Sequence, residues 1–536
     1  MLAKSSVWAW VVSYVVVIVF LVGQTDQEYP AVILGAFAFA FVQWRLPACR
    51  PVSHNWLCPW NWALAVFFLQ LVVMPVLITL AGPVLNVLPY LPSSFAINVA
   101  ILVNTIAFLS FSFTYSHLAG PRKVRTDPTL ERAAAELSVQ LSPALWSIWI
   151  YLSLGLFGTL LTFGTLSAFL GYLTNPAEYR DLLAELSSTW PGVFGVFLRP
   201  FLGFSFVMIW CRQMDRIGSG RSGLHFALFT ALILAAVTLS YGTFSYNRAS
   251  FTVPLIAMTA VSLAKRERFS LAVMILGVIL VLVAAPALGA YRSSNFSGQQ
   301  VFEDPSARDV VLKKPYVMES VQAYGAAPQF MGFLLENNGW TAAPCWGAVT
   351  VSSILSPLPI LGKPFRESSG PTIYNMMIYG TPEIVDQIVP FQGELFLDFN
   401  IVGVIIGYCF LGWIAHKLQR AFERSRSSLD FFIWQYAAIW MFFLIFGSIS
   451  VVSQVYFYFG WPIYLYFLYR RLRSRSAREL AHVSDEGRLV QSRVWTLPTF
   501  LTNETHSNRV SVRTSRFFSI YAKPLARRRS NAPDSP

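Results

Sequence analysis

Long apolar runs separated by short polar connections dominate the chain. A helix needs about 20 apolar residues to cross the hydrocarbon core of a bilayer. By this measure the sequence predicts an all-α polytopic membrane protein with about 12 transmembrane helices. The predicted spans are 7–22, 31–44, 60–82, 95–119, 144–173, 191–211, 224–244, 249–264, 269–289, 394–415, 429–449 and 455–469. The run 144–173 exceeds one crossing and is expected to tilt or to break near Gly155 or Gly164.

Basic residues collect in every second connection between these spans. The basic connections are 45–59, 120–143, 212–223, 265–268 and 416–428, whereas 23–30, 83–94 and 174–190 carry little positive charge. Because cytoplasmic loops are enriched in Lys and Arg, this alternation places both termini in the cytoplasm. The tail 470–536 has 14 Lys and Arg against 5 Asp and Glu, and is predicted to be cytoplasmic and disordered.

One connection is far longer than the others. Residues 290–393 separate two predicted spans, and the charge alternation places them outside the cytoplasm. Long loops in compact proteins are usually functional, although a small stabilising cap is the simpler interpretation. The predicted organisation is nine helices over 1–289, a large extracytoplasmic loop over 290–393, three helices over 394–469, and the tail.

Composition narrows the class of protein. Hydrophobic residues make up 55% of the 536 residues and charged residues only 12%, which excludes a disordered chain and a simple soluble enzyme. The net charge of +13 lies in the tail and the basic connections, so it fits membrane orientation and predicts no nucleic-acid partner. The Cys and His residues show no metal-ligand spacing, and neither a metal nor a cofactor is expected.

Four arginines stand out as candidate ligands of an anionic substrate. Arg199 lies inside a predicted span before Pro200, which is expected to kink that helix. Arg248 occupies a very short outer turn, Arg292 follows the next span, and Arg366 lies in the large loop. The guanidinium group binds phosphate oxygens in pairs, so these residues suit a diphosphate. The alternative is that the side chains reach lipid headgroups without a catalytic role.

Carboxylates occur where the large loop enters the next span. Glu394 and Asp398 are four residues apart at a helix start, so they are expected on one helix face at the membrane mouth. Stabilisation of the helix dipole is a sufficient explanation for Glu394, whereas Asp398 lies one turn deeper and needs a partner. Gly403, Gly407, Gly412 and Gly447 predict close helix packing nearby.

The segment Gly393-Glu-Leu-Phe-Leu-Asp398-Phe-Asn-Ile-Val-Gly403-Val-Ile-Ile-Gly407 resembles the O-antigen polymerases of the Wzy type. In that family a large outer loop ends in a Gly-Glu-x-aromatic run that enters a Gly-rich span, and the predicted topology agrees. The chain departs from the family pattern at Asn400, where Gly is more usual, and lacks an Arg-x10-Gly pattern from Arg248, Arg292 or Arg366. The related ligases use a loop His, which this loop lacks.

The resemblance implies transfer of a polyprenyl-diphosphate-linked oligosaccharide onto a sugar hydroxyl at the outer face of the bacterial cytoplasmic membrane. Arg199, Arg248, Arg292 and Arg366 would bind the diphosphate, and Glu394, Asp398 or Asp386 would act as the base. Trp340 and Trp346 would stack on sugars, although packing is an equal explanation. Membrane lipid, a flippase and a chain-length regulator are the implied partners.

Two other functions remain open at this level. A glycosyltransferase of the GT-C type carries acidic residues in its first outer loop, where this chain has Asp26 and Glu28. A transporter or flippase of lipid-linked glycans would place charges at mid-depth in several spans, where Arg199 is nearly alone. A structural scaffold would not require Arg248.

Overall fold

The structure is a computed structural model, and it describes the greater part of the predicted membrane region. The described residues are 29–52, 58–83, 88–120, 142–174, 189–217, 224–245, 248–264, 328–338, 343–358, 361–381, 389–425 and 427–470. Their regular elements are helices, and none of these residues forms a strand. The all-α prediction is therefore confirmed for this part of the chain.

Five helical stretches in the described residues are long and apolar enough to cross a membrane: Pro59–Leu80, Ser94–Ala119, Leu145–Phe163, Trp190–Arg216 and Phe391–Glu423. The first combines α3 (Pro59–Phe68), the π-helix η2 (Leu69–Val73) and α4 (Met74–Ala81), and the fourth combines α10 (Trp190–Leu198) and α11 (Pro200–Ile217). The others are α5 (Ser94–Ala119), α7 (Leu145–Phe163) and α21 (Phe391–Glu423). The protein is accordingly a helical membrane protein.

Several further predicted spans are also helical. They correspond to α2 (Ala31–Arg45), α12 (Leu224–Ser245), α13 (Arg248–Ala264), α22 (Ser428–Phe443) and α23 (Ile449–Phe459). The sequence predicts that one span ends at residue 449 and the next begins at 455, and this boundary is wrong. The chain already leaves the helix over 444–448, and Ser448 caps the start of α23. The spans predicted at 7–22 and 269–289, Asp26 and Glu28, and the tail beyond Arg470 lie outside the described residues.

Two predicted helix interruptions are confirmed. The run 144–173 breaks at Gly164, whose positive φ of 72° ends α7 before α8 (Leu166–Thr174) begins. The span around Arg199 is interrupted where Pro200 starts a new helix, because proline lacks the N–H that would continue the ladder. A tilted but continuous helix would show neither interruption.

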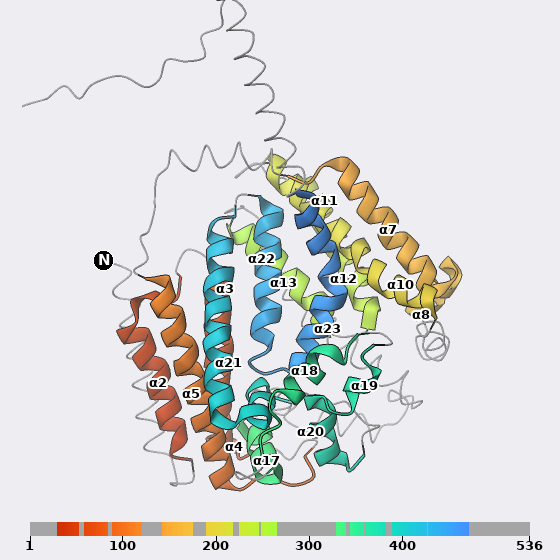
Figure 1. The fold of residues 1–536 in the computed structure, drawn as a ribbon. Coiled ribbons are helices and arrows are strands. Elements are labelled where there is room, and N and C mark those ends of the chain that lie inside the picture. Colours follow the sequence, from red (N-terminus) through yellow and green to blue (C-terminus); the bar gives the residue numbers. More distant parts are fainter. Residues whose placement is uncertain are drawn as a thin grey trace, which may run out of the picture. The chain divides into compact units, whose positions relative to one another are not determined.

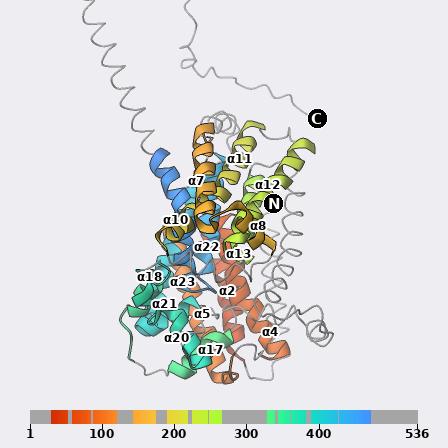
Figure 2. The ribbon, with the colours of Figure 1, turned by 90° about the vertical axis from the view of Figure 1, so that its right-hand side faces the viewer.

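The described helices bury two large apolar clusters, which share α22 and α23, and a smaller third one. The first large cluster is formed mainly by α2, α3, α5 and α21, and the second mainly by α7, α11, α12 and α13. The small cluster lies between α2, α4 and α5. Figure 1 shows α22 and α23 between these two groups of helices. The short helices α17 (Pro328–Asn338), α18 (Ala348–Leu355), α19 (Lys363–Arg366) and α20 (Gly370–Tyr379) gather at one end of the bundle in Figures 1 and 2.

These short helices, all from the 290–393 connection, are attached to the membrane helices. The Glu336 carboxylate of α17 accepts a hydrogen bond of 2.8 Å from the Ser93 N–H and a second from the Ser93 hydroxyl, which also caps α5. Gly332 lies directly on the backbone of Ala96, where an added Cβ would be 3.3 Å from the Ala96 carbonyl carbon. The described part of the connection is therefore docked on the bundle.

Gly412 shows why small residues are needed between α5 and α21. A Cβ at this position would lie 2.5 Å from the Phe111 carbonyl oxygen, and the rigid helix backbone cannot move aside easily. We expect Gly412→Val to lower the stability of the detergent-solubilised protein by about 1–3 kcal/mol, as overpacking does. Thermal unfolding followed by scanning fluorimetry would measure this loss. Ile406→Leu, at a position that is 64% exposed, is the control and should unfold like the wild type.

Candidate functional site

The start of α21 folds back on the rest of the helix. Phe399 and Asn400 have non-helical backbone angles, and the rings of Phe391 and Tyr408 are only 5.4 Å apart. In a straight helix these residues would be about 25 Å apart. Residues 391–398, here called the fold-back segment, therefore lie alongside the following turns of α21.

Glycines make this reversal possible. A Cβ at Gly403 would be 2.4 Å from the Leu395 carbonyl oxygen, and one at Gly407 would be 2.4 Å from the Leu395 side chain. Gly447, in the break after α22, similarly lies against Phe443 at the end of that helix. The predicted close packing of two helices is thus confirmed at Gly412, against α5, whereas the close contacts of the other three glycines are within one element or with the one directly before it.

Glu394, in the fold-back segment, is fully buried at a junction of three helices. Its carboxylate accepts hydrogen bonds from the Ser353 hydroxyl of α18 at 2.7 Å and from the Ile449 N–H at 2.6 Å. Gly370 covers the same carboxylate, since an added Cβ there would be 2.4 Å from Oε1. The Gly370 N–H in turn donates to the Ser353 hydroxyl at 2.9 Å.

Ile449 and Gly370 are the first residues of α23 and α20, so two helix N-termini approach Glu394. The partial positive charge of a helix N-terminus stabilises a nearby carboxylate. The hydrogen bonds that the Glu394 carboxylate accepts within the described residues come from neutral donors. Burying a carboxylate away from water costs free energy when its partners are neutral. Glu394 is thus an unusual buried acid at the junction, with one hydroxyl and one N–H bound to it.

Asp398 has a different environment. Its Oδ1 accepts from the Gly347 and Val349 N–H groups at 3.1 and 3.0 Å, and its Oδ2 accepts from the Thr350 N–H at 2.7 Å. These donors belong to the first turn of α18, which has no side-chain cap of its own. The deeper position of Asp398 required a partner, and the N–H groups at the start of α18 provide it. Both carboxylate oxygens of Asp398 accept hydrogen bonds from them.

The loop before α18 is joined to the fold-back segment through its backbone as well. The Cys345 and Trp346 N–H groups donate to the carbonyl oxygens of Leu397 and Asp398, both at 3.0 Å. Cys345 is exposed, but partial desolvation and the nearby Asp398 carboxylate raise the pKa of its thiol. Trp346 itself is 76% exposed, so its ring is available at the surface.

Asn400 allows the reversal at the end of the fold-back segment. Its φ of 54° and ψ of −147° lie in a region that favours glycine. We expect Asn400→Gly to be tolerated and Asn400→Val to lower stability by about 1–3 kcal/mol, because a branched side chain strains this conformation. The unfolding midpoints of the two variants in detergent would provide the comparison. Equal midpoints would contradict the assigned backbone strain.

The predicted arginines do not form a single cluster in the described residues. Arg366 is exposed on α19, and its Nε lies 3.5 Å from the Ser356 carbonyl oxygen beside α18. Arg199 is buried at the junction of α10 and α11, with its guanidinium carbon 4.8 Å from the centre of the Phe163 ring. Arg248 is the first residue of α13. Arg292, Asp386 and Trp340 lie outside the described residues.

A buried polar network supports the fold-back segment from behind. The Gln392 amide donates to the Asn104 Oδ1 at 2.9 Å and accepts from the Tyr408 hydroxyl at 3.0 Å. Gln70, within the π-helix η2, donates to the Ile445 carbonyl oxygen at 3.2 Å in the break between α22 and α23. The network and Glu394 hold the irregular backbone at both 391–400 and 444–448.

Sequence reasoning missed Ser353 and this network. Gln70 and Asn104 were visible as isolated amides inside apolar spans, a signal that predicts buried polar contacts. Ser353 had no such signal, because a serine in a polar loop is unremarkable until its partner is known. Its role emerges only from the contact between α18 and the fold-back segment.

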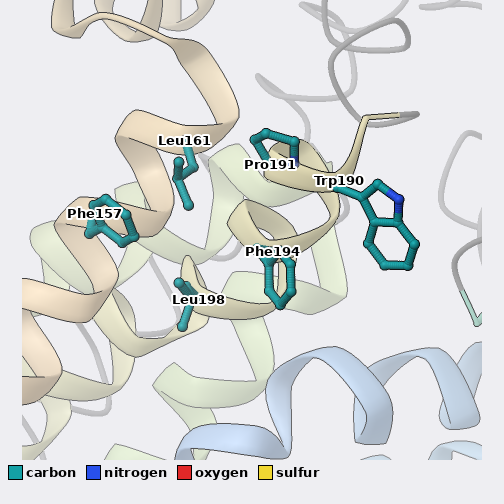
Figure 3. A pocket seen from close by; sticks show the side chains of 6 residues that line it. All are labelled: Phe157, Leu161, Trp190, Pro191, Phe194 and Leu198. Atoms are coloured by element: carbon teal, nitrogen blue, oxygen red, sulfur yellow. The ribbon is translucent and has the colours of Figure 1, made fainter.

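A separate hollow lies between α7 and α10 and offers no polar chemistry. Figure 3 shows the side chains around it, which are Phe157, Leu161, Trp190, Pro191, Phe194 and Leu198. Several of these are more than half exposed and belong to membrane-crossing stretches. Contact with lipid chains is a sufficient explanation for such a surface.

Four predicted residues, Glu394, Asp398, Trp346 and Arg366, thus lie on or beside α18 and the fold-back segment. No group of three or more His, Cys, Asp or Glu side chains in the described ranges could hold a metal ion. The chain matches no protein-family model, and no curated protein or solved structure is significantly similar to it. The junction around Glu394 is the strongest candidate site in the described part of the chain.

Proposed function

We propose that this protein is a glycosyltransferase of the Wzy type, which polymerises polyprenyl-diphosphate-linked oligosaccharide repeats such as those of O-antigen or exopolysaccharide. It acts at the outer face of the bacterial cytoplasmic membrane, with about 12 transmembrane helices and both termini in the cytoplasm. Two features support the proposal: membrane-crossing helices, and the resemblance of residues 393–407 to that family. Nucleic acid is not a partner in this scheme, and no cofactor is required.

The observation that carries the proposal is the burial of Glu394 beneath helices of the connection. A carboxyl group in a low-dielectric junction, hydrogen-bonded to Ser353 and to the start of α23, is suited to take up a proton. The 290–393 connection is then the large outer loop, and α18 and α20 cover the acid until substrate arrives. Because Gly370 lies against the carboxylate, it has to move aside in this scheme when substrate binds.

In the proposed reaction an acceptor sugar hydroxyl attacks the anomeric carbon of the lipid-linked glycan. A new glycosidic C–O bond forms, the bond from the anomeric carbon to the diphosphate breaks, and the bonding electrons leave with the polyprenyl diphosphate. Glu394 accepts the hydroxyl proton. Arg366, exposed beside α18, stabilises the leaving charge, and Arg199, Arg248 and Arg292 remain candidates for the same task.

Complementation of a deletion strain tests this function. Without the gene, the surface glycan should carry single repeats, and the wild type should restore the polymer ladder on a gel. Arg366→Ala should shorten or remove the ladder, while Lys363→Ala, an exposed cation on the same short helix, should retain it. A ladder that survives deletion would refute the proposal. Failure of repeats to reach the outer face would favour a flippase instead.

A further inference from the structure

The helix α18 buries both of its serines together with Val349, and it exposes the aliphatic side chains of Val351 and Ile354. Ser352 and Ser353 are buried against the bundle, whereas Val351 and Ile354 are 51% and 38% exposed. A helix on a water-facing surface shows the opposite arrangement, with apolar residues inside and polar residues outside. The outer face of α18 is therefore suited to an apolar surrounding.

This apolar face continues onto a membrane-crossing helix. Trp346, just before α18, lies edge-on to Phe399, with ring centres 6.3 Å apart and planes at 79°. Phe399 is followed along one side of α21 by an exposed apolar stripe at helical spacing, formed by Val402, Ile406 and Phe410. Because α21 is long and apolar enough to span a bilayer, this exposed stripe is a surface suited to lipid.

Charged side chains lie at the other border of the same surface. After α18 the chain exposes Leu361, 70% accessible, and then the cations Lys363 and Arg366 on α19. Apolar residues beside Lys and Arg characterise an element in the membrane interface, where cations reach lipid phosphates while aliphatic groups enter the acyl region. A tryptophan such as Trp346 is favoured at the same depth.

We infer that α18 lies in the interface of the adjacent bilayer leaflet and that phospholipid covers its outer face. Val351 and Ile354 contact acyl chains, Trp346 sits at the headgroup boundary, and Lys363 and Arg366 face lipid phosphates. Continuity with the exposed apolar stripe of α21 favours lipid over a partner protein as the occupant. This placement does not depend on the proposed activity.

The placement has a consequence for the Glu394 junction. Ser353, on the inner side of α18, contacts Glu394, so the acid lies one helix thickness from the lipid. An anionic headgroup moving within the leaflet would meet Arg366 before it reached α18. A lipid-linked substrate could thus approach without leaving the bilayer.

Site-directed spin labelling of the full-length protein in phosphatidylethanolamine and phosphatidylglycerol nanodiscs tests this inference. Single cysteines replace Val351 or Ile354 in a Cys345→Ser background, and the labelled background measures any reaction at the remaining native cysteines. Ser368→Cys and Glu367→Cys, exposed polar positions after α19, are the matched controls. Power saturation compares collisions with oxygen, which concentrates in lipid, and with a water-soluble nickel chelate.

At Val351 and Ile354 we expect oxygen collisions to exceed nickel collisions several-fold relative to the two controls. Nickel accessibility equal to that at Glu367 would overturn the inference, because the face would then contact water. Low accessibility to both reagents would also overturn it, since protein or a second copy would then cover α18. The measurement uses no substrate, so its outcome is separate from that of the complementation assay.

Discussion

Glu394→Gln should abolish the polymer ladder while the protein still accumulates in the membrane. Glutamine has nearly the same shape, and its Oε1 can accept the Ile449 N–H while its amide donates to the Ser353 hydroxyl. The fold therefore loses little, whereas the proposed base is removed. Loss of a general base typically slows a reaction by about 10²–10⁴-fold. Ladder length on a gel and in vitro polymerisation by the purified protein would measure the loss.

The matched control for this change is Glu336→Gln. Glu336 belongs to the same connection and also accepts two hydrogen bonds, but it holds the start of α5 at an exposed contact. We expect this variant to keep its ladder. If Glu394→Gln polymerises like the wild type, Glu394 is a structural acid, and the carboxylate at the junction serves only the packing of α18, α20 and α23.

Asp398→Asn should act on stability more than on chemistry. Asparagine retains one acceptor oxygen and turns an amide toward the N–H groups of the α18 first turn, so a bond such as that from Thr350 is lost. Hydrogen bonds to a charged group contribute about 1.5–3 kcal/mol each, so we expect a loss of that order. Unfolding of the solubilised protein should begin at a lower temperature, with α18 detaching from the fold-back segment.

The thiol of Cys345 reports this detachment directly. Partial desolvation and the Asp398 carboxylate raise the pKa of this exposed thiol, so at a given pH less thiolate is present and alkylation is slower than for an unperturbed cysteine. Removing the charge and loosening the loop both increase the reactive thiolate, and Asp398→Asn should accelerate maleimide labelling. Glu367→Gln, at an exposed position, should leave the rate unchanged. An unchanged rate in Asp398→Asn would contradict the assigned role of Asp398.

Glu394 and Asp398 have different surroundings, and this difference separates their roles, which their spacing in the sequence left open. At the sequence level both were candidates for a base, and dipole stabilisation was the simpler explanation for Glu394 rather than Asp398. The structure places Asp398 at the N-terminus of α18 with both oxygens engaged, while Glu394 contacts the starts of two other helices. Both acids lie at helix N-termini, but Asp398 accepts three N–H groups at the start of α18, whereas Glu394 accepts one, from the start of α23.

The sequence by itself determined the membrane class, most helix locations in the described part, and the interruption at Arg199-Pro200. It limited the break in the run 144–173 to Gly155 or Gly164, and the structure selects Gly164. These features depend on local properties, namely apolar length, glycine freedom and the missing proline N–H. The positions of Glu394 and Asp398 at the start of α21 followed from the same local reasoning.

Only the tertiary structure decided the reversal of residues 391–398, the partnership of Ser353 with Glu394 and the outward apolar face of α18. A hydropathy pattern carries no information on whether a helix continues straight or folds back. Here the answer depends on the backbone of Asn400, the space left by Gly403 and Gly407, and bonds to distant helices. Such contacts join residues separated by up to hundreds of positions, so no local pattern can specify them.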